Sequence, residues 1–379
     1  MIFLDNASTT EIYEEVNKKL YEINKNSFYN PSALYQNAID TSNLLNDAKK
    51  QLAKNLGTSA EHIIFTSGAT EANNLAIIGS LTGKKDAEYI FSLGEHPSVF
   101  NVANNLKTQN KNIKFIDIKD GGIVDENSLR NNLNENTHFV SIIHVSNETG
   151  AINNIKKLCS IIKDYNSNIL VHVDGTQAFG KISVDIENLG VDLYTISAHK
   201  FHGPKGVGAL YVKNLQKLKP IILGGGQQNG MRSGTENVSG NLAMALASEI
   251  STKNLKGNFD KVLAFKNYFK QKIAENCTEY IINEAPENSP YILSVSFKGI
   301  RGEVLLHMLE KQGVLIGTGS ACSSKKQNNR VLENLKLSKE YMLGSIRISF
   351  SSFNTQEEIE KASNIFIEQY KQLKLNMEK

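Results

Sequence analysis

Short apolar segments, each followed by a glycine or polar turn and then a helical pattern, recur through the first half of the chain. Apolar residues at helical spacing from about Pro31 to Leu56, ended by Gly57, predict a helix ahead of the first such segment. The segments are rich in Val, Ile and Leu in nearly continuous runs, which is typical of strands buried on both faces. Strands of this kind, alternating with helices, predict an α/β fold with a mostly parallel sheet covered on both faces. The strand candidates are residues 62–65, 88–91, 114–117, 137–143, 169–173 and 193–196.

Beyond Pro220 the order of elements changes. The pattern predicts a long helical stretch from about Val238 to Asn276, then strands at 291–297 and 345–350 with helices between and after them. This order is typical of an α+β unit, so we expect a second, smaller domain. The expected boundaries are 14–249 for the large α/β domain, and 1–13 with 250–379 for the small α+β domain.

Composition excludes several classes of protein. Among 379 residues, 42 Lys and Arg against 39 Asp and Glu give a net charge of +3, which argues against a dedicated nucleic-acid surface. The chain has no apolar run of the about 18–20 residues that a membrane span needs. The cysteines, Cys159, Cys277 and Cys322, are too widely spaced for a disulfide framework or a zinc site. We therefore expect a soluble cytoplasmic protein that binds neither metal, membrane nor nucleic acid.

Polar residues at the strand ends carry the functional argument, because ligands of an open parallel sheet bind beyond the carboxyl ends of its strands. The segment Ser67–Glu71 connects a strand candidate to a helix candidate. Its small residues would let backbone N–H groups and the Thr70 hydroxyl close on a phosphate. The same segment also fits a simple helix N-cap, and taken alone it leaves both interpretations open.

Two further strand ends carry charged residues. Asp174 ends a buried strand, where a carboxylate is costly unless it meets a cation or several donors, although a capping role also fits. Lys200 follows the next strand, where burial would lower the pKa of its amine and free it for Schiff-base chemistry. Phosphate donors, a carboxylate and an amine on three separate loops are what pyridoxal phosphate requires.

The chain contains the motifs Leu4–Thr10, Tyr29–Ser32, Ser67–Asn74, Glu95–Val99, Ser146–Gly150, His172–Ala178, Ser197–Lys200, Arg232–Asn237 and Gly319–Ser324. Together these motifs resemble those of the cysteine desulfurases of the NifS/IscS type. They run in the family's order from residue 4 to about residue 350. The resemblance implies a pyridoxal-phosphate-dependent transferase of fold type I, with a mostly parallel, seven-stranded sheet in its large domain. It also implies a homodimer whose active sites lie at the subunit interface.

The resemblance further implies roles for single residues. Three would be catalytic: Lys200 as the Schiff-base lysine, His96 stacked on the cofactor ring and handling protons, and Cys322 as the sulfur acceptor. Asp174 would pair with the ring nitrogen and Gln177 with the ring hydroxyl. The phosphate would be held by Ala69, Thr70, Ser197, His199 and, from the partner subunit, Thr235. The substrate would be bound by Asn30, Asn147 and Arg347, with Asn147 also near the ring.

The implied reaction removes sulfur from L-cysteine, giving L-alanine and a persulfide on Cys322. An acceptor protein of iron–sulfur cluster assembly or tRNA thiolation would then receive the sulfur. A selenocysteine lyase or another enzyme of the same fold is an alternative, and a non-catalytic scaffold of the sulfur pathway is a further one. Cys322 ahead of Arg347 favours sulfur transfer over transamination. Cys159, at helical spacing among apolar residues, is expected to be a buried structural thiol, and Cys277 has no evident role.

Overall fold

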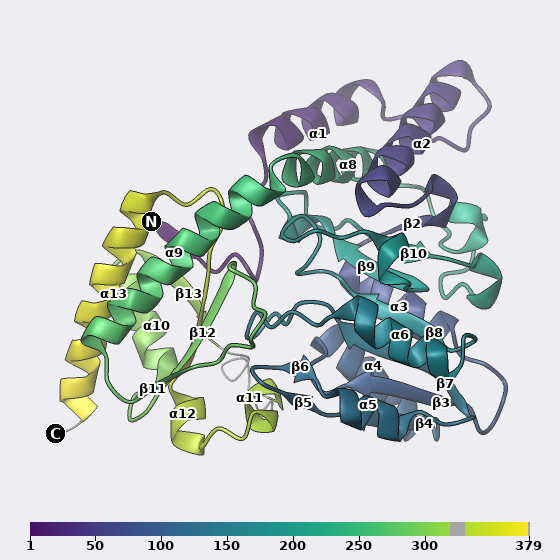
Figure 1. Ribbon diagram of the computed structural model, residues 1–379. Helices are drawn as coiled ribbons and strands as arrows, with labels where there is room; N and C mark the ends of the chain where they lie inside the picture. The colour runs from purple at the N-terminus through teal and green to yellow at the C-terminus, as the bar shows by residue number, and fades with distance from the viewer. Residues whose placement is uncertain (319–329, 378–379) are drawn as a thin grey trace.

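A seven-stranded sheet forms the larger lobe of the computed structural model, which describes residues 1–318 and 330–377 (Figure 1). Strand β10 runs antiparallel to both of its neighbours, and the other neighbouring strands pair in parallel. The predicted mostly parallel sheet is therefore confirmed. In order across the sheet, the strands are β2 (Ile63–Thr66), β10 (Gly208–Val212), β9 (Leu193–Ser197), β8 (Leu170–Asp174), β7 (Thr137–Ile143), β3 (Glu88–Ser92) and β4 (Asn112–Ile116).

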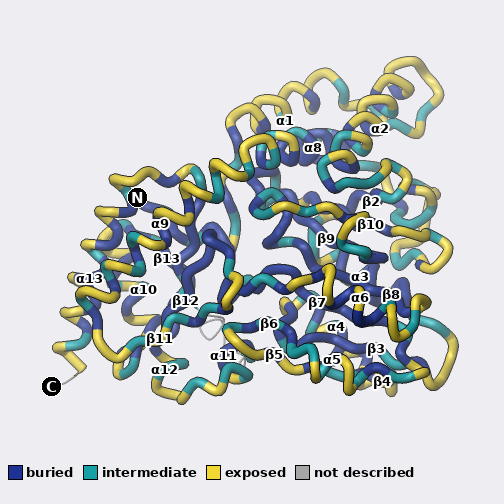
Figure 2. The backbone as a smooth tube through the Cα atoms, viewed as in Figure 1, coloured by how far each residue is buried: buried dark blue, intermediate teal, exposed yellow. Residues whose placement is uncertain are grey.

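Both faces of this sheet are covered by helices, which explains the continuous apolar runs. Successive side chains of a strand point to opposite faces. In β2, Ile63 and Phe65 join the core formed with α2, α6 and α8, whereas Ile64 joins the core formed with α3 and α4. The tube in Figure 2 is accordingly dark blue along most of the central strands. These helices are α2 (Gln36–Leu56), α3 (Ala69–Gly79), α4 (Pro97–Thr108), α6 (Ile155–Tyr165) and α8 (Val238–Lys253).

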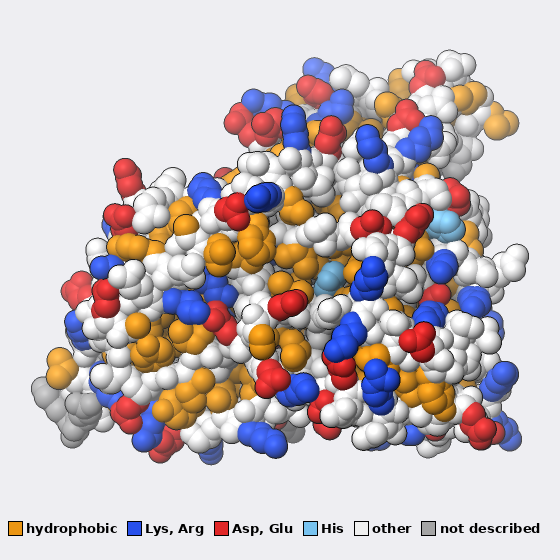
Figure 3. All heavy atoms as spheres, viewed as in Figure 1, with side chains coloured by type: hydrophobic (Ala, Val, Ile, Leu, Met, Phe, Trp, Pro, Cys, Tyr) orange, Lys and Arg blue, Asp and Glu red, His pale blue; other side chains and the backbone are white. Residues whose placement is uncertain are grey.

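Short elements complete the larger lobe. Helix α1 was not foreseen, and α2 begins five residues later than the expected Pro31, because Tyr35 is still extended. None of the helices within the described ranges is long and apolar enough to cross a membrane. Figure 3 shows basic and acidic side chains interspersed over the visible face. The remaining elements of this lobe are α1 (Glu14–Asn26), α5 (Glu126–Asn132), α7 (Ile186–Leu189), β5 (Ile118–Lys119) and β6 (Ile123–Val124).

The smaller lobe is built on a five-stranded sheet packed against α9, α10 and α13. Its first strand comes from the N-terminus of the chain and pairs in parallel with β13, while the other pairs are antiparallel. Across the sheet the order is β1 (Ile2–Leu4), β13 (Val314–Thr318), β14 (Ser345–Ser349), β12 (Ile292–Phe297) and β11 (Tyr280–Ile282). The helices are α9 (Leu255–Asn276), α10 (Gly302–Lys311), α11 (Arg330–Asn334), α12 (Lys339–Leu343) and α13 (Gln356–Met377).

The expected helical stretch from Val238 to Asn276 is not continuous. Asn254, with φ −119° and ψ 36°, separates α8 from α9. Helix α8 contributes to the core of the larger lobe and α9 to that of the smaller lobe, so the break lies where the chain passes between them (Figure 1). A single straight helix could not bury its apolar side against both cores.

The segment that follows β1 connects the two lobes. On the small-lobe side, the Asn6 side chain donates to the Ser349 carbonyl at 3.0 Å. On the large-lobe side, the Thr10 backbone N–H donates to the His199 carbonyl at 3.0 Å. The residues between them, Ala7 to Thr9, are thereby held beside the loop that carries Lys200.

Candidate active site

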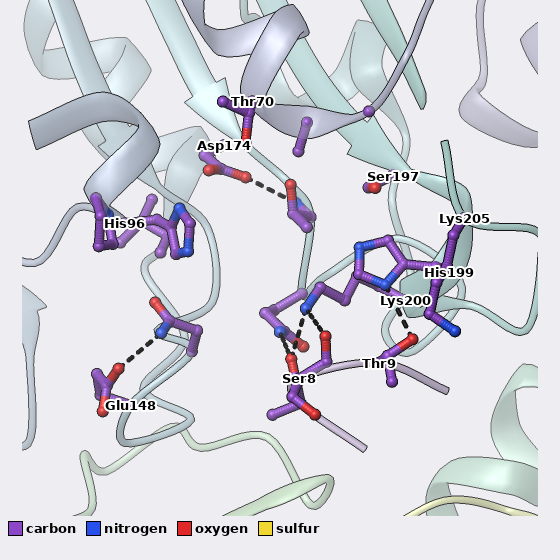
Figure 4. Close-up of a pocket in the computed structure, with 18 of the residues that line it drawn as sticks. Ser8, Thr9, Thr70, His96, Glu148, Asp174, Ser197, His199, Lys200 and Lys205 are labelled. Atoms are coloured by element: carbon purple, nitrogen blue, oxygen red, sulfur yellow. Dashed lines mark hydrogen bonds between the residues drawn. The ribbon is translucent and has the colours of Figure 1, made fainter. Parts of the chain in front are cut away.

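A cavity of about 690 Å³ lies at the carboxyl ends of the large-lobe strands and brings together most of the expected site residues (Figure 4). Asn30 and Thr235 do not line it, and both are exposed on this chain. Cys322 lies outside the described residues. The expected site residues that line the cavity are Ala69, Thr70, His96, Asn147, Asp174, Gln177, Ser197, His199, Lys200 and Arg347.

Lys200 presents its amine to the cavity from a short 3₁₀ turn, Ala198–Lys200, that directly follows β9. Its Nζ donates to the carbonyl oxygens of Ala7 at 2.7 Å and Ser8 at 2.6 Å. Burial, and after it the charge of Arg347, lower the pKa of Lys200 to about 8, while the carboxylates of Asp5 and Asp174 act in the opposite direction. The lowered pKa makes the unprotonated, nucleophilic form of this amine far more populated near neutral pH than in an ordinary lysine.

Asp174 ends β8 with its carboxylate held by two donors. Asn73 Nδ2 donates to Oδ2 at 2.9 Å, and the Thr176 backbone N–H donates to Oδ1 at 3.0 Å. These bonds fix the carboxylate toward the cavity, where it can pair with a cationic ring nitrogen. His172, on the same face of β8, does not line the cavity; its ring nitrogens lie 2.9 Å from Ser141 Oγ and 3.2 Å from Thr195 Oγ1.

Ala69 and Thr70, two of the residues expected to hold the phosphate, lie at the N-terminus of α3. Gly68 precedes the helix with φ 147°, a backbone conformation that favours glycine, and the Ala69 and Thr70 amides follow in the first turn. First-turn amides have no partner inside their helix and point outward with the positive end of its dipole. Ser197, the last residue of β9, and His199, in the turn that follows, also line the cavity.

A second glycine keeps this turn in place. A Cβ on Gly208 of β10 would lie 2.7 Å from the Gly68 backbone and 2.8 Å from the Ile196 carbonyl. The atoms nearest to this added Cβ all belong to the backbone, so no flexible side chain could move to make room for it.

We therefore expect Gly208→Ala to displace the Gly68 turn. Overpacking of this kind costs about 1–3 kcal/mol, so we expect a lower free energy of unfolding and pyridoxal-phosphate binding weakened by about tenfold. Chemical denaturation and fluorescence titration of the apoprotein measure the two quantities. Gly83→Ala is the control, because a Cβ there meets nothing within 4 Å. Equal cofactor affinity in the two variants would contradict the role given to Gly208.

His96 precedes α4 and is open to the cavity. Its Nδ1 accepts a hydrogen bond from the Ser98 backbone N–H at 3.1 Å and lies 2.8 Å from Ser98 Oγ. This leaves Nε2 for a ligand. The surrounding protein lowers the pKa of His96, chiefly because it desolvates the charged form, while Asp174 acts in the opposite direction. A neutral imidazole in this position can accept a proton at neutral pH.

Arg347, in β14 of the smaller lobe, reaches the cavity from the opposite side. Its Nη1 donates to the Asn147 carbonyl at 2.9 Å, and its Nη2 contacts Asp5 Oδ1 at 3.0 Å. The Asn147 side chain donates to Glu148 Oε1 at 2.8 Å. Arg347 Nε is buried and has no hydrogen-bond partner among the described residues. A guanidinium held in this way presents a directed donor to an anionic group in the cavity.

The described residues fit pyridoxal phosphate. Besides Arg347 Nε, the buried hydroxyl of Thr176 on the cavity wall has no partner among the described residues, as expected of polar atoms reserved for a ligand. Lys200 would bind the aldehyde, Asp174 the ring nitrogen and the α3 N-terminus the phosphate. When bound, the group withdraws electrons from the substrate carbons.

The sequence reasoning missed several residues of this site. Ala7, Ser8 and Thr9 line the cavity beside Lys200, and Thr9 Oγ1 lies 3.1 Å from His199 Nδ1. Their motif, Leu4–Thr10, is part of the family resemblance, but the sequence alone gives these residues no role. Their contacts with His199 and Lys200 join positions about 190 residues apart. Asn73, which orients Asp174, was also missed; its place one turn into α3 was the available signal.

The two described cysteines are buried and unsuited to nucleophilic chemistry. Burial raises the pKa of both Cys159 and Cys277 to about 12. Cys159 packs in the large-lobe core, as predicted for a structural thiol. Cys277 packs in the small-lobe core at the end of α9.

Comparison with known proteins agrees with this site. The family described as aminotransferase class-V matches residues 2–362, and the chain belongs to this family of pyridoxal-phosphate-dependent enzymes. A cysteine desulfurase IscS of Dictyoglomus turgidum is 36% identical over 94% of this chain and 91% of its own length. One from Buchnera aphidicola is 37% identical over 95% and 90%. A solved NifS-like protein superposes with a TM-score of 0.93 at 31% identity, covering 98% of this chain and 100% of that one. The predicted NifS/IscS type, its fold and its cofactor are confirmed.

Proposed function

We propose that this chain is a cysteine desulfurase that converts L-cysteine to L-alanine and transfers the sulfur to the Cys322 thiol as a persulfide. The observation that carries the proposal is the low-pKa amine of Lys200 in one cavity with the Asp174 carboxylate and the Arg347 guanidinium. An amine, a carboxylate and a guanidinium so placed suit an amino acid bound to pyridoxal phosphate. Sequence similarity to named cysteine desulfurases supports cysteine as that amino acid.

The chain's own residues divide the work. Arg347, which lines the cavity, would bind the substrate carboxylate through its guanidinium and exchange the contact with Asp5 for it. Lys200 and His96 would accept and return protons at the substrate carbons, since both have lowered pKa values and both line the cavity. The overall transfer balances: L-cysteine and the Cys322 thiol give L-alanine and the Cys322 persulfide.

The proposed assembly is a cytoplasmic homodimer that passes its sulfur to an acceptor protein of iron–sulfur cluster assembly or tRNA thiolation. Thr235, exposed and away from the cavity of its own chain, would contact the phosphate in the partner's site. Light scattering gives the mass in solution, and loss of cofactor affinity in Thr235→Ala tests the shared site. A monomer with full activity would exclude the shared site.

The activity itself is tested with protein reconstituted with pyridoxal phosphate and supplied with L-cysteine and a thiol reductant. We expect alanine and sulfide in equal amounts, and without reductant a mass increase of one sulfur atom on the peptide that contains Cys322. Pyruvate or unchanged cysteine as the outcome would contradict a desulfurase. Selenocysteine is supplied in a parallel assay. Turnover of selenocysteine without turnover of cysteine would identify a selenocysteine lyase.

The carboxylate contact predicts a specific kinetic change in Arg347→Lys. A lysine keeps the charge but loses the planar fork, and a hydrogen bond between charged groups contributes about 1.5–3 kcal/mol. We therefore expect KM for cysteine to rise by about 10- to 100-fold, with a smaller change in kcat. Steady-state alanine formation measures both constants. Arg301→Lys, an exposed arginine outside the cavity, is the control, and equal KM values in the two variants would remove Arg347 from the substrate site.

A further inference from the structure

A buried lysine beside the cavity is not used by the chemistry described above. Lys181 is 5% exposed, and it follows Gln177 by four residues in the turn after β8. Its Nζ donates to Gln177 Oε1 at 2.7 Å and lies 5.7 Å from the centre of the Tyr291 ring.

The buried Lys181 amine has no carboxylate partner among the described residues that would offset the cost of its burial. The pKa of Lys181 is lowered to about 7, first by burial and then by the cations Lys200 and Arg347, and no carboxylate among the described residues raises it. Lys266, a similarly buried lysine of the smaller lobe, instead pairs with Glu284 at 2.7 Å. An unpaired buried amine costs stability, so packing alone is a poor reason for Lys181.

Hydrogen bonds connect Lys181 to the Schiff-base lysine through Gln177. Gln177 Oε1 accepts a hydrogen bond from Lys181 Nζ, and Gln177 Nε2 donates one to the Ala7 carbonyl at 2.8 Å. The same Ala7 carbonyl accepts from Lys200 Nζ at 2.7 Å. An amide has one acceptor end and one donor end, so a donor at one end and an acceptor at the other leave one orientation. That orientation places the nitrogen of Gln177 on the Lys200 side.

We propose that Lys181 is a positioning residue, which holds Gln177 with its NH₂ group directed to the cofactor's ring oxygen. The inference rests on the proposed function, because it takes Gln177 as the partner of the ring hydroxyl. Ala7 uses one hydrogen of Nε2, and the second is the one available to the ring oxygen. The titratable side chains that line a small cavity together with Lys181 are Tyr13, Lys200, His202 and Tyr291, and none of them is a carboxylate.

The test uses Lys181→Met and two readouts other than turnover. The first is the dissociation constant of pyridoxal phosphate from titration of the apoprotein, which we expect to rise about tenfold. The second is the pH midpoint of the bound cofactor's visible absorbance, which reports proton loss beside Lys200. Loss of the oriented Gln177 donor, which stabilises the ring oxygen after the proton has left, makes that proton harder to remove, so the midpoint moves upward, by about one pH unit.

Coupling to Gln177 separates positioning from a purely structural role. Gln177→Leu alone should reproduce both changes, and Lys181→Met added to it should have less than about a twofold further effect. Lys266→Met is the matched control and should lower thermal stability without moving the midpoint. The proposal fails if Lys181→Met leaves both readouts unchanged, or if its effects are undiminished in the Gln177→Leu background.

Two outcomes keep the conclusions distinct. If Lys181→Met does not fold, Gln177→Leu still decides, because unchanged binding and midpoint in that variant leave Lys181 nothing to act through. If the wild-type apoprotein does not bind pyridoxal phosphate, the proposed function fails before Lys181 is tested.

Discussion

Lys200→Ala should purify without the visible absorbance of the parent protein and should lose cysteine turnover by about 10³-fold or more. Among the described residues, two lysines line the cavity and could bond the cofactor's aldehyde: Lys200 and Lys205. Lys205 is exposed, so Lys200 is the better candidate. Its pKa, lowered to about 8, favours the nucleophilic amine form near neutral pH. Borohydride treatment of the reconstituted wild type should fix one cofactor on the peptide containing Lys200, and should fix none in the variant.

Lys205→Ala is the matched control, since Lys205 also lines the cavity but is exposed. We expect it to keep the visible absorbance, with cofactor binding weakened by a few-fold at most, because an exposed charge is screened by solvent. If borohydride labels Lys205 instead, or if Lys200→Ala retains the covalent cofactor, the assignment of the Schiff-base lysine is wrong.

Strand-end chemistry was the part of the site that the sequence could predict. Thr70, Asp174 and Lys200 each follow a strand recognisable from its apolar run, and parallel strands bring such ends to one edge. The structure places all three in one cavity. Local pattern and sheet topology together therefore predict that residues between positions 70 and 200 meet in one site.

Contacts made by side-chain packing across lobes could not be predicted in that way. Nothing in the local sequence shows that Ala7 accepts from Lys200, or that Asp5 pairs with Arg347 across 342 positions. The break at Asn254 was missed for a related reason: helical periodicity persists through it, and only the two separate cores require the chain to turn. Lys181 was overlooked because a lysine gives no sequence signal of burial, although its spacing of four from Gln177 was visible.

The described residues on either side of Cys322 in sequence lie at the cavity or close to its wall. Thr318, four residues earlier, lines the cavity. Arg330, eight residues later, donates from Nε to the Leu93 carbonyl at 2.8 Å and packs over the Phe100 ring, close to His96 in sequence. The described residues that flank Cys322 in sequence are thus one residue of the cavity wall, Thr318, and one that contacts the segment just before His96, Arg330. This arrangement supports Cys322 as the sulfur acceptor.

Cys322→Ser should keep bound pyridoxal phosphate and its visible absorbance, yet release sulfide from cysteine at a rate reduced by about 100-fold or more, which corresponds to about 2.7 kcal/mol of transition-state stabilisation. A serine hydroxyl does not ionise at neutral pH and cannot form the sulfur–sulfur bond that breaks the substrate's carbon–sulfur bond. Methylene blue formation measures sulfide, and mass spectrometry measures the persulfide. Cys277→Ala is the control and should retain turnover, because burial raises the pKa of that thiol to about 12. Normal sulfide release by Cys322→Ser, or its loss in Cys277→Ala with the cofactor still bound, would move the acceptor role away from Cys322.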